Sequence, residues 1–388
     1  MKNRKDYVNK LILSIMASLL LLIACYLIDN IPYPFGAKTG ILTFKEKFIR
    51  NSKTNQTNYD SVVFVNSGYD IQLVDTDNGK EAITNRETLH RFLEDIDNTE
   101  YKYIFIDIRF EKGLVTPIDS VLVSKINSMR DITIAKHWNY NNEKDFELID
   151  ESLLDKAAYC DYVYSLYNTS FSKYQFNQKN GPSAALDIYQ KVNKRDVKKR
   201  LGLFYTDKRS ICFNSLFLTI SDNFLEQESE DHSARYLNLG SDIYDWYTID
   251  DFKKYCKGKI ICIGDFAFDR HDTYYGKQPG TYLHWLAYDS LCNKKHIVKC
   301  WLLILLLILY ASIFYCKTIK IDLAHYFRNR FLSFLISLIG SSLVLFMACF
   351  ILYWLSGTVI SVFFPSLVFS FYNLILQYKE YDGNKKEF

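Results

Sequence analysis

The sequence predicts an extracytoplasmic α/β domain, with a mostly parallel sheet flanked by helices, inserted between one N-terminal and three C-terminal transmembrane helices. Two observations predict this fold class. Long apolar runs occupy both ends of the 388-residue chain, whereas the middle is polar. Within that middle, short apolar runs alternate with amphipathic runs, which is typical of strands and helices in βαβ units.

The first apolar run covers residues 11–28 and is long enough to cross a bilayer. Basic residues precede it and favour a cytoplasmic N-terminus: Lys2, Arg4, Lys5 and Lys10. A cleaved signal peptide is one alternative. Lipidation of Cys25 is another, because residues 22–25 resemble a bacterial lipobox. The apolar run continues past Cys25 to Ile28, which favours an uncleaved anchor.

Three further apolar runs follow the polar middle, at residues 300–315, 331–355 and 358–376. Only Ser356 and Gly357 separate the last two, which predicts an antiparallel hairpin. Residues 317–330 carry four basic side chains and are expected in the cytoplasm. The predicted order is a cytoplasmic arm and first helix (1–28), an outer domain (29–299), three helices (300–376) and a cytoplasmic tail (377–388).

The first half of the middle region reads as strand, helix, strand, helix, strand. We expect strands at 61–66, 103–107 and 132–136, and helices at 85–96 and 118–129. The first helix places four apolar residues on one face: Leu89, Phe92, Leu93 and Ile96. Near-continuous apolar strands suit a parallel sheet that is covered on both faces.

The second half is less regular. Residues 139–183 are expected to hold loops and short elements, and residues 226–231 an acidic loop. We expect a helix at 183–192 and strands at 211–220, 235–239 and 259–263. A polar loop rich in Asp and His then leads to a helix at 280–292, which runs towards the membrane.

Charge and motifs exclude several function classes. The net charge of +3 is too small for a nucleic-acid partner. No phosphate-binding loop, dinucleotide fingerprint or Ser/His/Asp arrangement is present, so we expect no cofactor and no enzyme. The nine cysteines include no CxxC pair, and buried thiols are expected. A bridge between Cys256 and another cysteine stays open.

Two segments carry a resemblance to a known family: GKIICIGDFAFDRHDT at 258–273 and PGTYLHWLAYDSL at 279–291. They resemble the second type of CHASE domain, a bacterial extracytoplasmic sensory module. That family shows a GKIVLIG-like strand, a loop with Asp before Thr, and a PG-x-x-x-H turn into a helix. Residues 83–86, 105–110 and 182–186 are also similar, in the same order. The resemblance covers about residues 30–376, including one span before the domain and three after it.

The resemblance implies a multi-pass protein of the bacterial inner membrane. In the family, the three spans usually lead to a kinase or cyclase, and this chain departs from that pattern by stopping at Phe388. We therefore expect a sensor or adaptor that passes a signal through its transmembrane helices to a separate membrane or cytoplasmic protein with the output activity. A homo-oligomer stays open. Alternatives are a structural subunit of an envelope complex and an extracytoplasmic metal-dependent hydrolase.

Candidate ligand- or ion-binding residues follow the last strand: Asp265, Asp269, His271, Asp272 and His284. Carboxylates and imidazoles together are a common ligand set for divalent metals. Asp107 joins them because open α/β sheets bind ligands at the carboxyl ends of their strands. The alternative is that these side chains cap helices or tie loops. A tyrosine-rich surface is a further candidate contact patch: Tyr140, Tyr162, Tyr164, Tyr167 and Tyr174.

Overall fold

The computed structural model describes residues 2–29, 59–77, 79–139, 143–162, 173–178, 181–200, 204–207, 210–212, 214–218, 220, 236–246, 249–273, 276–321, 329–356 and 360–386. The chain divides into two compact units. The helical unit comprises Met1–Lys45, Lys199–Phe213 and Lys295–Phe388. The α/β unit comprises Glu46–Lys198 and Asn214–Lys294.

A six-stranded sheet forms the centre of the α/β unit, in the order β14-β1-β15-β4-β5-β8. In that order the strands are Leu237–Asn238, Val62–Asn66, Ile260–Gly264, Tyr103–Asp107, Ile132–Lys136 and Ala157–Tyr159. Every neighbouring pair is parallel. The predicted parallel sheet is confirmed.

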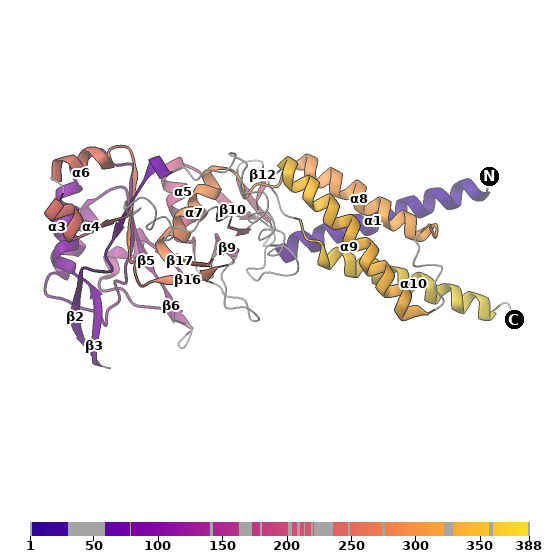
Figure 1. Cartoon of the computed structure of the whole chain (residues 1–388), viewed down its shortest axis with the longest axis horizontal. Helices are drawn as coiled ribbons and strands as arrows, with labels where there is room; N and C mark the ends of the chain where they lie inside the picture. The colour runs from indigo at the N-terminus through magenta and orange to yellow at the C-terminus, as the bar shows by residue number, and fades with distance from the viewer. Residues whose placement is uncertain are drawn as a thin grey trace. The chain divides into compact units, whose positions relative to one another are not determined.

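Helices cover both faces of this sheet (Figure 1). One face packs against α5 (Ala184–Asn193) and α7 (Gly280–Cys292). The other packs against α3 (Arg86–Ile96), α4 (Asp119–Ser128) and α6 (Ile249–Cys256). Burial of both faces is what the continuous apolar strands predicted.

Successive side chains along each strand point to opposite faces of the sheet, and so contribute to two separate apolar cores. Phe105 of β4 and Cys262 of β15 belong to the core beneath α5 and α7. Their neighbours Ile104 and Ile261 belong to the core beneath α3, α4 and α6. Each strand therefore contributes apolar side chains in both directions, which explains why these strands are recognisable in the sequence.

Polar side chains begin two of the predicted helices. Asn85 Oδ1 accepts hydrogen bonds from the backbone N–H groups of Glu87 and Thr88, at 3.0 and 3.1 Å, and so caps α3. Ser183 caps α5 through the backbone N–H of Leu186. Such caps satisfy backbone donors that have no partner inside the helix. Both helices agree with the sequence to within one residue.

The region 139–183 contains short elements, as predicted, and one of them, β8, belongs to the central sheet. β8 pairs with β5 over three residues, which is too short a run to stand out in the sequence. The predicted strand 211–220 is wrong as one element. It is divided between β12 (Ser210–Cys212) and β13 (Ser215–Phe217), which pair with different strands.

Short hairpins complete the unit. The expected polar loop before α7 is a hairpin of β16 (Arg270–Thr273) and β17 (Gly276–Pro279). A second hairpin, β2 (Ile71–Thr76) with β3 (Gly79–Thr84), follows β1. The remaining elements are β6 (Trp138–Asn139), β7 (Lys144–Asp145), β9 (Lys173–Gln175), 3-10 helices at Tyr59–Ser61 and Glu151–Lys156, and a π-helix at Asp242–Trp246. The predicted acidic loop 226–231 lies outside the described residues.

The helical unit contains four long helices: α1 (Lys2–Asp29), α8 (Cys300–Thr318), α9 (Arg330–Ser356) and α10 (Phe363–Lys386). It also contains β11 (Phe204–Asp207) and β12, and the division between the units falls within β10 (Val197–Arg200) along the chain. An apolar core joins residues of all four long helices.

Three helices among the described residues are long and apolar enough to cross a membrane: Arg4–Asp29, Cys300–Thr318 and Arg330–Leu352. They coincide with three of the four predicted spans, so the chain is a membrane protein. The fourth predicted span falls largely in α10, which is not one of these three helices. α10 is more polar because it holds Asn373 and Gln377 and ends in charged residues.

Candidate metal and ligand site

The candidate site lies at the carboxyl edge of the sheet, where several strand ends meet at one level. Asn66 of β1 pairs with Gly264 of β15, and Gly264 pairs with Asp107 of β4. Ligands of open α/β folds bind at this edge. The N-terminal part of α7 closes over it, because an added Cβ on Gly264 would lie 2.0 Å from Thr281 Oγ1.

Asp107 is the acidic centre of the site. Its side chain is only 7% exposed. Burial raises its pKa to about 6, and the neighbouring Asp269 carboxylate acts in the same direction. Thr281 Oγ1 donates a hydrogen bond to Asp107 Oδ2 at 2.9 Å. This bond and the nearby imidazoles offset only part of the cost of burying the charge.

His284 faces Asp107 from α7. It follows Thr281 by three residues, so both side chains lie on the same face of the helix. The imidazole is fully buried, and its Nδ1 is hydrogen-bonded to the Tyr174 hydroxyl at 2.7 Å. Its Nε2 has no hydrogen-bond partner among the residues that the structure describes, and lies 3.9 Å from Asp107 Oδ2. Burial, followed by the nearby His271 and His137, lowers the pKa of His284 well below its ordinary value.

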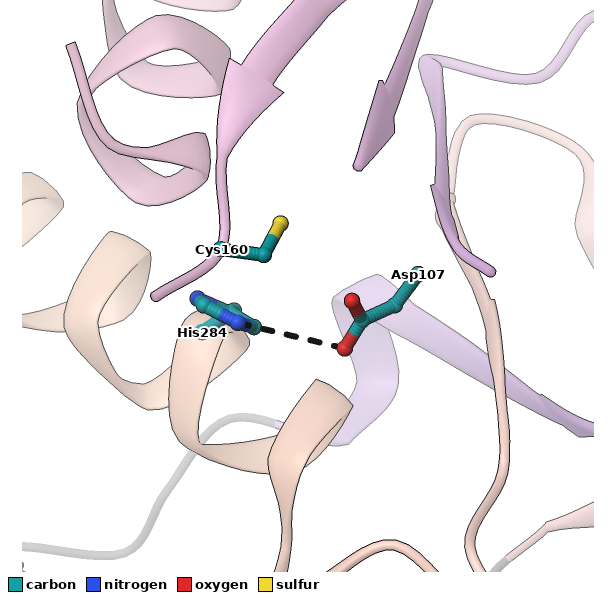
Figure 2. Close-up of side chains that lie close together, drawn as sticks. All are labelled: Asp107, Cys160 and His284. Carbon is teal, nitrogen blue, oxygen red and sulfur yellow. Dashed lines mark ion pairs between the residues drawn. The ribbon is translucent and has the colours of Figure 1, made fainter. Parts of the chain in front are cut away.

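Cys160 is the third member of the cluster and directly follows β8 in the chain. Its thiol is 2% exposed and donates weakly to the Ala158 carbonyl at 3.7 Å. Burial, and then the Asp107 and Asp161 carboxylates, raises the pKa of this thiol well above its usual range. One ligand atom from each of Asp107, Cys160 and His284 lies within 4.8 Å of the other two (Figure 2).

An outer layer of polar side chains surrounds this cluster. His271 Nε2 lies 3.2 Å from Asp269 Oδ1. The Tyr162 ring lies between two imidazoles, with its centroid 4.2 Å from that of His271 and 4.9 Å from that of His284. Its hydroxyl donates to the Gly280 carbonyl at 2.7 Å. A Cβ on Gly280 would lie 2.5 Å from Asp269 Oδ2, so a larger residue here would displace the Asp269 carboxylate.

A pocket of about 320 Å³ opens beside the cluster. Its polar wall includes Asp107, Asp269, Asp265, His137 and Arg109. Its apolar wall comes mainly from the β2–β3 hairpin and from the residue after Asp107: Ile71, Ala82, Ile83 and Ile108. The volume is at the lower end of small-molecule sites. Asp107 therefore belongs both to the buried cluster and to the pocket.

The structure brings together four of the residues chosen from the sequence: Asp107, Asp269, His271 and His284. Asp265 lines the pocket, but its Oδ1 accepts hydrogen bonds from the backbone of Ala267 and Phe268, at 2.9 and 2.8 Å. Asp265 thus ties a turn, which was the alternative interpretation.

Two other choices lie away from the cluster. Asp272 is exposed and points to the opposite side of β16 from His271, because adjacent strand residues alternate. Cys25 lies within α1, which continues without a break to Asp29. Cys256, for which a bridge stayed open, is not in a disulfide among the residues that the structure describes.

Sequence reasoning missed Cys160, Thr281 and His137 as members of the site. The sequence holds no clear signal for Cys160, because the strand that it follows, β8 at the edge of the sheet, has only three residues. Tyr162 and Tyr174 were chosen as surface residues, whereas both contact His284. Tyr140, Tyr164 and Tyr167 lie outside the described residues.

The cluster offers one carboxylate oxygen, one sulfur and one imidazole nitrogen, which together suit cation binding. Nucleophilic catalysis by Cys160 is disfavoured, because a thiol with a raised pKa is a poor nucleophile. Comparisons of the chain with models of protein families, with curated proteins and with solved structures find no match.

Proposed function

We propose that the chain is a membrane-anchored sensor or adaptor. Its α/β unit binds a ligand at the carboxyl edge of the sheet, and its membrane helices pass the change to a separate partner protein. One observation carries this proposal. Thr281 and His284, which face Asp107, stand on α7, and residues 293–299 join α7 to the apolar helix α8. A ligand that moves α7 therefore acts on the chain segment that enters the membrane helix.

The proposed setting is the bacterial inner membrane, with the α/β unit outside the cytoplasm and both termini inside. Basic residues before the first apolar helix support this orientation: Lys2, Arg4, Lys5 and Lys10. The resemblance to the second type of CHASE domain supports the same orientation. With both termini in the cytoplasm, α10 must form a fourth span.

Single-cysteine labelling tests this orientation. The exposed cysteines Cys292, Cys300 and Cys316 are first replaced by Ser. In intact cells, we expect Lys254→Cys, on the exposed side of α6, to react with a membrane-impermeant maleimide. Lys5→Cys and Lys379→Cys should react only after permeabilisation. Protection of Lys254→Cys in intact cells would overturn the orientation. Labelling of Lys379→Cys in intact cells would contradict the fourth span.

Hydrogen exchange tests whether the site acts on α8. In the full chain in lipid nanodiscs, we expect Asp107→Asn to change amide exchange across residues 293–303. The physical reason is that the neutral side chain alters the contact with Thr281 and hence the position of α7. Asp155→Asn makes the same chemical change at an exposed position and is the matched control. A structural subunit without transmission would show changed exchange only around the site.

A further inference from the structure

We propose that Asp107, Cys160 and His284 bind one divalent cation of the thiophilic class, represented by Zn²⁺. This inference deepens the proposed function, because it names the chemical class of the ligand. The role of the cation as a signal rests on the proposed function, whereas the existence of the binding site does not.

The spacing of the three ligand atoms suits a metal ion. Zn²⁺ binds O, N and S ligands at about 2.0–2.3 Å, which places the ligands about 3.3–3.7 Å apart around a tetrahedron. Asp107 Oδ2 and His284 Nε2 are separated by 3.9 Å, and all three ligand atoms lie within 4.8 Å of one another. A contraction of about 1 Å or less brings the three atoms into coordination.

One nitrogen of the His284 imidazole is placed to bind a cation. His284 Nε2 is fully buried, has no hydrogen-bond partner among the described residues, and points at the Asp107 carboxylate. A distance of 3.9 Å is too long for a hydrogen bond, whichever group carries the proton. A buried polar atom without a partner is costly. A cation between the imidazole and the carboxylate satisfies both groups at once.

The surrounding hydrogen bonds suit metal coordination. The Tyr174 oxygen lies 2.7 Å from His284 Nδ1 and can accept its proton, which leaves the Nε2 lone pair for a metal. Ser183 and the backbone of Ala185 also lie within hydrogen-bond reach of this phenol. Thr281 fixes Asp107 by donating to Oδ2. Such outer partners orient the ligands of protein metal sites.

The ligand set selects the cation. Thiolate and imidazole favour Zn²⁺ and related transition metals, whereas Mg²⁺ and Ca²⁺ prefer oxygen ligands alone. Three protein ligands leave one position of a tetrahedron for water or another ligand. Asp107 also lines the pocket, so one of the three ligands faces this cavity.

Metal titration of the full chain tests the site. The protein is purified in detergent, stripped with EDTA, dialysed and titrated with Zn²⁺ or Co²⁺. We expect one equivalent per chain, with the near-ultraviolet absorption of a thiolate bound to Co²⁺. Cys160→Ser should remove that absorption, whereas Cys256→Ser, at a buried cysteine of α6 in the other core, should keep it.

Affinity separates coordination from packing. We expect His284→Gln to weaken Zn²⁺ binding by at least about 100-fold, and Tyr174→Phe by about 10-fold, as for an outer partner. Mg²⁺ in excess should not displace Zn²⁺. If Cys160→Ser does not fold, zinc-edge X-ray absorption of the wild-type chain decides by showing or lacking one sulfur ligand.

Two outcomes would overturn the metal site: no stoichiometric binding, or unchanged Co²⁺ absorption in folded Cys160→Ser. Its failure is distinguishable from failure of the sensor. Zn²⁺ binding that leaves exchange across residues 293–303 unchanged would refute transmission and keep the site. An exchange response to Asp107→Asn without Zn²⁺ binding would keep transmission and refute the site.

Discussion

Replacing Asp107 by Asn is expected to stabilise the metal-free α/β unit at pH 8 while removing its metal binding. A pKa of about 6, against 3.8 for an ordinary aspartate, corresponds to about 3 kcal/mol of cost for the ionised form. Asparagine keeps the size of the side chain but carries no charge. For a domain of this size, the midpoint of thermal unfolding should rise by roughly 6–12 °C.

The pH dependence has a definite sign. The folded-state pKa of Asp107 is raised, so between about pH 4 and 6 the folded state holds a proton that the unfolded chain has released. The free-energy cost of burying the ionised Asp107 carboxylate is therefore fully present above about pH 6 and absent below about pH 4. We expect the advantage of Asp107→Asn to shrink steadily as the pH falls through this window.

Thermal unfolding of EDTA-treated protein in detergent, followed by intrinsic fluorescence, measures this effect. Asp155→Asn is the control for loss of an exposed carboxylate and should stay within about 0.5 kcal/mol of wild type. A variant Asp107→Asn that is less stable than wild type at pH 8 would show that the ionised carboxylate is well compensated. The claim that burial of the ionised Asp107 carboxylate costs stability would then fail.

Replacing Arg86 by Ala is expected to have the largest destabilising effect. This guanidinium is fully buried at the start of α3, over the Phe110 ring at 4.3 Å and 3.9 Å from Asp119 Oδ1. It also donates to the Arg109 carbonyl. Removal leaves a cavity and strips Asp119 of its buried counter-charge, at a cost of about 3–5 kcal/mol.

The matched control for this prediction lies on the same helix. Arg91 is exposed and stacks 4.1 Å above the Tyr244 ring, so Arg91→Ala should cost about 0.5–1 kcal/mol. Arg86→Met keeps much of the packing volume and should fall between the two. Thermal unfolding of the three variants at pH 7.5 makes the comparison. A loss below about 1 kcal/mol for Arg86→Ala would contradict the prediction.

Much of the sheet could be predicted because burial of both faces leaves a strong pattern. β1, β4, β5 and β15 each have five residues, most of them apolar and buried, and the sequence locates all four. β8 has only three residues, and the β16–β17 hairpin has mostly polar ones. Pairing with distant segments fixes these elements, and local composition does not reveal it.

The site shows the same division. Asp107 and His284 could be chosen because strand ends and the turn before α7 are visible in the sequence. Cys160 could not, because its place depends on β8 joining the sheet beside β5. Asp272 differs from His271 only in the face of β16 that it occupies. An assignment to a face requires the hairpin register, which residue types alone do not provide.

The close contact of Gly264 with Thr281 holds α7 against the sheet near the start of the helix. A tilt of α7 would therefore pivot about Thr281. At 1.5 Å per residue, His284 lies about 4.5 Å along the axis from Thr281, and Cys292 about 16 Å. A tilt that shifts His284 by half an ångström, roughly what metal closure needs, would displace the far end of α7 between three and four times as far, by about 2 Å.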